Sequence, residues 1–140
     1  MVRALLDANV LISAALRPSG APGQIVTALL AQQAFELVLS PAIIAEVEKA
    51  LGLPKIRRYL REPDEALLWL ADLAAFADLV QDTGGVAGVC RDPADDVVLA
   101  AAVEGRAGAI VTGDADLLTL GEYEGIAIVT PRAFLDLIKG

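Results

Sequence analysis

Aspartate residues cluster at one point of the chain, where residues 91–101 read RDPADDVVLAA. Asp92, Asp95 and Asp96 fall within five positions, and an almost wholly apolar run follows them. Carboxylates this close repel one another, and burial raises their pKa unless a cation lies between them. The crowding points to a bound divalent cation. On this view Asp96→Asn should leave the metal-free protein as stable as before, or more stable.

Each of these aspartates also has an explanation that needs no metal. Asp92 before Pro93 is typical of the N-cap and first position of a helix. Asp95 and Asp96 would then lie in the first helical turn, where exposed backbone N–H groups favour negative charge. That effect is worth under about 1 kcal/mol per charge at a surface, so it explains one aspartate better than three.

Two other aspartates end predicted strands. Asp7 ends the apolar run 2–7, and Asp114 ends the run 108–114. Ligand sites of open α/β sheets lie beyond the carboxyl ends of the strands, where both side chains would meet. The alternative is that each aspartate caps a following helix, with Asp116 as a solvated neighbour of Asp114.

A glutamate on the helix predicted for residues 41–51 is the next candidate. Glu46 and Glu48 both lie at the edges of its apolar stripe, and spacing alone does not choose between them. Ser40 and Thr112 place hydroxyl groups at strand ends. Those hydroxyls either support a site or simply bond to nearby backbone.

Composition restricts the chemistry. The chain has no histidine, which excludes imidazole ligands, histidine general bases and Ser-His-Asp triads. The single cysteine, Cys90, excludes an internal disulfide and fits a reducing compartment. Clustered carboxylates suit Mg²⁺ or Mn²⁺, which prefer oxygen ligands. Such an ion can activate water toward a phosphate and neutralise charge on the leaving oxygen.

The charge balance limits how the chain could bind nucleic acid. Lys and Arg number 11 against 19 Asp and Glu, a net charge of −8, so the overall field repels polyanions. Five of the 11 basic residues nevertheless fall within 13 positions, and they are candidates for RNA contact or for a solvated or protein-binding surface. They are Lys49, Lys55, Arg57, Arg58 and Arg61.

Strands and helices alternate along the chain, which predicts one α/β domain over residues 1–140. Short Val/Ile/Leu runs predict about five strands in a mostly parallel sheet, covered by helices on both faces as a three-layer α/β/α sandwich. The predicted strands are 2–7, 35–40, 78–82, 108–114 and 126–130, and the predicted helices include 21–33, 41–51, 54–60, 63–77, 94–105 and 131–139. No segment reaches the roughly 20 apolar residues of a membrane span. We therefore expect a cytoplasmic protein.

Three segments together resemble the PIN-domain ribonucleases, in particular the VapC-like toxins of toxin–antitoxin systems. They read LLDANVLISAAL, LSPAIIAEVEKAL and RDPADDVVLAAAVEGRAGAIVTGDADLL. The third segment is the most specific, because it fixes residue types over 28 positions. One departure is Ala8, where a hydroxyl residue is usual after the first aspartate.

The resemblance implies a set of metal ligands. It selects Glu46 over Glu48, and it makes Asp96 the third acidic ligand with Asp95 as a close rival. The implied catalytic set is Asp7, Glu46, Asp96 and Asp114, with Asp95 and Asp116 as further metal ligands. Asn9, Thr112 and Ser40 are the polar residues expected to orient them.

The function implied by the resemblance is Mg²⁺- or Mn²⁺-dependent cleavage of RNA that leaves a 5′-phosphate and a 3′-hydroxyl. The resemblance also implies a homodimer and an antitoxin partner, and the surplus of apolar residues in helices 21–33 and 63–77 agrees with such interfaces. Alternatives are a PIN nuclease that is not a toxin and a catalytically silent PIN module that binds RNA or a partner.

Two unrelated classes fit less well. A haloacid-dehalogenase-like phosphatase needs a second aspartate two residues after the first, where this chain has Asn9. A phospho-accepting receiver domain needs a lysine after a late strand, and here that strand runs into TPRAF.

Overall fold

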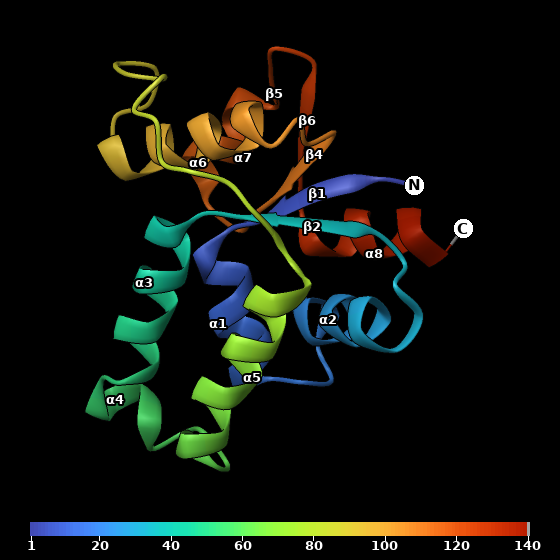
Figure 1. The fold of residues 1–140 in the computed structure, drawn as a ribbon, viewed down its shortest axis with the longest axis vertical. Coiled ribbons are helices and arrows are strands. Elements are labelled where there is room, and N and C mark those ends of the chain that lie inside the picture. The colour runs from blue at the N-terminus through green and yellow to red at the C-terminus, as the bar shows by residue number, and fades with distance from the viewer. Residues whose placement is uncertain (140) are drawn as a thin grey trace.

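A six-stranded sheet runs through the centre of the computed structural model, which describes residues 1–139 (Figure 1). Its order is β3-β2-β1-β4-β6-β5, and every neighbouring pair is parallel except β5 with β6. The strands are β1 (Arg3–Leu6), β2 (Glu36–Leu39), β3 (Asp78–Leu79), β4 (Ala109–Val111), β5 (Glu122–Tyr123) and β6 (Ile126–Val129). The predicted mostly parallel sheet is confirmed, with β5 as an additional strand.

Helices cover both faces of this sheet, so the predicted three-layer sandwich is also confirmed. Figure 1 shows α6 and α7 on one face, and α1, α2 and α8 on the other. On that second side α3 packs against α1, and α5 packs against α3. The helices are α1 (Ala8–Leu16), α2 (Ala21–Gln32), α3 (Pro41–Leu51), α4 (Pro54–Arg57), α5 (Pro63–Phe76), α6 (Pro93–Glu104), α7 (Ala115–Leu120) and α8 (Pro131–Lys139).

After the first residues of β1 and β2, Arg3 and Glu36, the central strands are apolar because neither face of the sheet meets water. Leu5, Val38 and Ile110 are fully buried in three adjacent strands. Prolines occupy the first turns of α3, α5 and α6, where their missing N–H leaves no hydrogen bond unmade. No helix within residues 1–139 combines the length and apolar composition needed to cross a bilayer.

The parallel arrangement brings the ends of distant strands to one edge. Asp7 follows β1 and donates its backbone N–H to the carbonyl of Val111 at the end of β4, at 3.0 Å. Thr112 follows β4 directly. Ser40 follows β2 and is buried, and its Oγ accepts a hydrogen bond from the backbone N–H of Ile43 at 3.4 Å. Ser40 therefore caps α3, which is the backbone-bonding alternative open from the sequence.

Asp96 fastens the long connection between β3 and α6 to the body of the protein. Its Oδ2 accepts a hydrogen bond from Gly88 N at 3.0 Å, and its Oδ1 accepts one from Cys90 N at 2.8 Å. The side chain is only 5% exposed. Each carboxylate oxygen therefore has a loop N–H as its partner, and Asp96 as the third metal ligand stays a prediction. A positive φ of 74° at Gly88 suits the turn that presents these N–H groups.

We expect Asp96→Asn to lower the free energy of unfolding of the metal-free protein by about 2 kcal/mol, the value of hydrogen bonds to a charged group. An asparagine at this position can accept one N–H, but its own amide group faces the other N–H. This expectation reverses the one drawn from crowded charges alone. Denaturant unfolding in EDTA measures the change.

Glu104→Gln is the matched control, because it removes a carboxylate from the exposed end of the same helix. Its stability should stay within about 0.5 kcal/mol of wild type. Equal stability of Asp96→Asn and wild type would show that the two loop contacts are not structural anchors.

Candidate metal centre

An open cleft of about 570 Å³ lies beyond the carboxyl ends of β1 and β4. Carboxylates from α1, α3, α6 and α7 or from their N-caps reach it, although they are far apart in the sequence. The acidic residues that line the cleft are Asp7, Glu46, Asp92, Asp95, Asp114 and Asp116. The expected convergence of strand ends therefore occurs.

Asp7 lies at the bottom of the cleft and is buried, with 5% of its surface exposed. Its Oδ1 accepts the backbone N–H of Ala8 at 2.8 Å, which makes it the N-cap of α1. Its Oδ2 accepts from Thr112 Oγ1 at 2.8 Å and from Asn9 Nδ2 at 3.0 Å. Burial raises the pKa of Asp7, and the hydrogen bond from Thr112 acts in the opposite direction. Asp7 thus caps α1 and also lines the cleft, and its role as a metal ligand stays a prediction.

Asn9 and Thr112 connect Asp7 to the loop that carries the next aspartate. Thr112 Oγ1 accepts a hydrogen bond from the backbone N–H of Asp114 at 3.0 Å. Asn9 Oδ1 accepts one from Gly113 N at 3.0 Å. These contacts fix the loop after β4 relative to α1, so they set where Asp114 stands with respect to Asp7.

Asp95, Asp114 and Asp116 form a tight group in which one carboxylate oxygen from each lies within 4.8 Å of the others. Asp114 Oδ1 accepts the backbone N–H of Asp116 at 3.4 Å and caps α7. Asp114 Oδ2 is buried and has no hydrogen-bond partner within residues 1–139. A buried carboxylate oxygen without a partner is unfavourable unless a cation completes it, so this group fits a metal ion.

The crowding of negative charge in this group affects the pKa of Asp95. The pKa of Asp95 is raised to about 7, chiefly by burial, and the closeness of Asp114 and the negative charges of Asp114, Asp92 and Asp7 also raise it. A proton on Asp95 thus relieves part of the repulsion near neutral pH. A divalent cation would displace that proton and balance more charge than the proton does.

Glu46 and Glu48 are both exposed on α3, but only Glu46 lines the cleft. Burial and then the charges of Asp7 and Asp92 raise the pKa of Glu46. The structure therefore gathers five of the predicted acidic residues and leaves Asp96 and Ser40 outside the cleft. The five are Asp7, Glu46, Asp95, Asp114 and Asp116.

Two residues near the cleft had no site role in the sequence interpretation. Asp92 caps α6 as predicted, with Oδ1 accepting from Ala94 N at 2.9 Å, and it also lines the cleft. Arg91 donates to Asp116 Oδ1 at 2.6 Å. The only sequence signal for either residue was its place in the quoted segment RDPADD.

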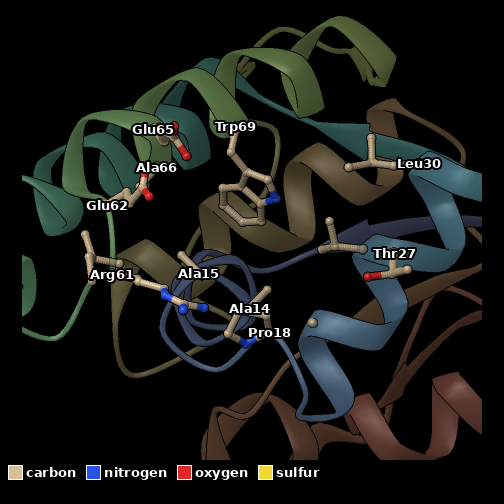
Figure 2. Close-up of a pocket in the computed structure, with 13 residues that line it drawn as sticks. Ala14, Ala15, Pro18, Thr27, Leu30, Arg61, Glu62, Glu65, Ala66 and Trp69 are labelled. Atoms are coloured by element: carbon tan, nitrogen blue, oxygen red, sulfur yellow. The ribbon is translucent and has the colours of Figure 1, made fainter.

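The basic residues around α4 lie away from these carboxylates, at the far end of α3 (Figure 1). Arg57 pairs with Asp64 at 3.5 Å, and Arg58 stacks over the ring of Tyr59 at 5.0 Å. Arg61 lines a different cavity, between α1, α2 and α5 (Figure 2). These positions leave RNA contact at α4 as a prediction.

Known proteins resemble this chain in sequence and in fold. A protein of Methanocaldococcus jannaschii, the uncharacterized protein MJ1680, is 29% identical, with 96% of this chain and 90% of that protein covered. The crystal structure of PAE2754 from Pyrobaculum aerophilum matches with a TM-score of 0.65 and 16% identity, over 99% of this chain and 90% of that one. The crystal structure of VapBC2 from Rickettsia felis bound to a DNA fragment from their promoter matches with a TM-score of 0.59 and 10% identity, over 92% and 98%.

At these identities the two crystal structures support the fold, and the family follows from the sequence. Residues 3–116 match the PIN domain, which is most of the chain. PIN domains are typically nucleases, and the acidic cleft lies within or beside this matched segment. By fold and by sequence, the chain belongs to the PIN domain family.

Proposed function

We propose that this chain is a ribonuclease that hydrolyses RNA phosphodiester bonds with Mg²⁺ or Mn²⁺, as the toxin of a toxin–antitoxin pair. The observation that carries the proposal is the buried, unpartnered Oδ2 of Asp114 beside Asp95 and Asp116. Membership of the PIN domain family supports nuclease chemistry at that position.

In this proposal Asp7, Asp95, Asp114 and Asp116 hold the ion, and Glu46 completes the acidic wall. Asp95 takes the role that the resemblance gave to Asp96, because its side chain lines the cleft while that of Asp96 is bonded to Gly88 and Cys90. A bound Mg²⁺ or Mn²⁺ would activate a water and neutralise charge on the leaving oxygen.

The remaining polar residues of the cleft have positioning and proton-transfer roles. Thr112 and Asn9 hold the carboxylate of Asp7 through the hydrogen bonds at its Oδ2, so that the ion meets a preset oxygen. Glu46 carries a carboxylate whose pKa is raised by burial and by Asp7 and Asp92. A raised pKa suits the acceptance of a proton from the attacking water.

The first test of the proposal is Asp95→Asn. We expect Mg²⁺- or Mn²⁺-dependent cleavage of labelled RNA to fall by at least about 100-fold, since losing a residue that only supports a metal ligand already costs roughly 10- to 100-fold. In EDTA the same variant should melt at an equal or higher temperature than wild type, because a crowded carboxylate is removed. Wild-type cleavage by the purified variant would contradict the assignment.

A matched pair on α3 provides the control. Glu46→Gln should reduce cleavage strongly, whereas Glu48→Gln, two residues away on the exposed surface, should cleave as wild type does. EDTA should abolish cleavage by both wild type and Glu48→Gln. Cleavage that persists in EDTA would point to a reaction that needs no metal.

RNA approaches this acidic protein along the basic end of α3 and α4 in our proposal. Lys49 stands three residues after Glu46, so both lie on one face of α3, and that face leads from the cleft toward α4. Lys55, Arg57 and Arg58 extend the positive charge beyond it, and Tyr59 is exposed and able to stack on a base.

Arg57→Ala combined with Arg58→Ala should weaken RNA binding, and it should flatten the dependence of log Kd on log salt by about 1 to 2 charge equivalents. Fluorescence anisotropy across a salt series measures both quantities. Arg132→Ala on α8 is the control for the loss of an exposed arginine. An unchanged salt slope in the double variant would remove α4 from the RNA path.

A groove on the other side of α1 is the surface that we assign to the antitoxin. It has a volume of about 600 Å³ between α1, α2 and α5, and Figure 2 shows Trp69 reaching into it from α5. Its floor is apolar, and Glu62 and Glu65 stand at its edge. A hydrogen bond with Glu62 and the charge of Glu62 raise the pKa of Glu65. An apolar segment that carries a lysine or arginine is complementary to this groove.

Trp69 is the only tryptophan of the chain and so reports on this groove. Titration with an apolar peptide that carries a lysine or arginine should change its fluorescence, and Ala66→Arg should weaken that binding by at least about 10-fold. Ala71→Arg, at an exposed position on the same helix, is the control. Unaltered binding by Ala66→Arg would contradict this assignment. So would a wild-type dimer that this variant dissociates in light scattering, because the predicted homodimer would then occupy the groove.

A further inference from the structure

Arg91 brings a positive charge to the outer edge of the acidic cleft. Its Nη2 lies 2.6 Å from Asp116 Oδ1, and Asp116 is one of the three aspartates grouped within 4.8 Å. Of the four ion pairs formed within residues 1–139, this one reaches the acidic group. A cation supplied by the chain itself therefore already partners one oxygen of the candidate metal centre.

The backbone on both sides of Arg91 is held in place, while its side chain is 86% exposed. Before it, Cys90 N is bonded to the carboxylate of Asp96. After it, Asp92 caps α6. The fixed backbone thus places the guanidinium of Arg91 beside Asp116. Rotation of the Arg91 side chain alone is enough to separate the two groups.

The ion pair between Arg91 and Asp116 is weak enough for a metal ion to replace Arg91. Asp116 is 39% exposed, and ion pairs between solvent-exposed groups contribute little to stability. A divalent ion among Asp95, Asp114 and Asp116 would interact with several carboxylates at once, and so it outcompetes a single exposed guanidinium.

We propose that Arg91 is an internal counter-cation that competes with the metal ion for Asp116 and thereby lowers the metal affinity of the site. Metal binding at the complete site then requires Arg91 to release Asp116, which frees the guanidinium at the mouth of the cleft. This inference rests on the proposed function, because it assumes that the carboxylates bind a metal.

The test is a double-mutant cycle read by Mn²⁺ binding in isothermal titration calorimetry. Arg91→Gln should bind Mn²⁺ about 2- to 5-fold more tightly than wild type, the range set by an exposed ion pair. In the Asp116→Asn background the same change at Arg91 should have no effect, because the carboxylate for which the two cations compete is gone. Arg106→Gln, at an exposed position after α6, should match wild type.

The outcomes separate the two claims. Absence of Mn²⁺ binding by wild type would overturn the proposed metal-dependent function. Binding by wild type with no gain in Arg91→Gln would overturn the competition alone. A gain that persists unchanged with Asp116→Asn would also overturn it, since the effect would then be a general one of net charge and not a contest for Asp116.

Discussion

The constraint on which this structure depends is the repulsion among carboxylates held at one edge of a parallel sheet. Asp7 is fixed there by three hydrogen bonds, and the loop after β4 is bonded to the same residues, so Asp114 cannot move away from Asp7 without breaking them. The result is a buried oxygen on Asp114 that has no partner among the described residues 1–139, and a pKa of about 7 at Asp95. Carboxylates with a raised pKa that gather in a cleft are typical of functional sites.

The fold supplies the rigidity that keeps these charges together. Parallel strands buried on both faces fix β1 and β4 side by side, and the carboxyl end of each carries one of the site aspartates. Three of the helix caps also line the cleft. Each of them accepts a hydrogen bond from the N-terminus of its helix, and they are Asp7, Asp92 and Asp114. The N–H groups at these helix ends stabilise negative charge, which offsets part of the repulsion.

Much of this could be predicted from the sequence, because periodicity and strand ends are local signals. The alternation of strands and helices and the proline-led helices α3, α5 and α6 were predicted, and the convergence of Asp7 with Asp114 followed from parallel strand ends. The sequence indicates helices α1 and α7 only through the alternative in which Asp7 and Asp114 cap a following helix. Strand β5 consists of Glu122 and Tyr123 and has no apolar run to indicate it, whereas the equally short β3 lies within the predicted strand 78–82.

The sequence could not predict which of Asp95 and Asp96 lines the cleft, for a physical reason. Neighbouring residues point about 100° apart around a helix axis, so only one of the two can face the cleft. The run that follows is apolar on every side of α6, so periodicity does not orient the helix. The decision comes from the loop before α6, which offers two N–H groups to Asp96 through a glycine in the left-handed region. Likewise, no local pattern indicated that Arg91 would reach Asp116 across 25 positions.

The central claim is that a divalent ion completes this acidic centre, and a crystal structure with Mn²⁺ bound tests it most directly. Anomalous scattering at the manganese edge identifies the ion independently of its surroundings. Our account predicts a peak within coordination distance of Asp114 Oδ2, with Asp95 as a second ligand and Asp96 still bonded to the loop. Saturating Mn²⁺ with no peak in the cleft, or a peak bound by Asp96 instead, would contradict it.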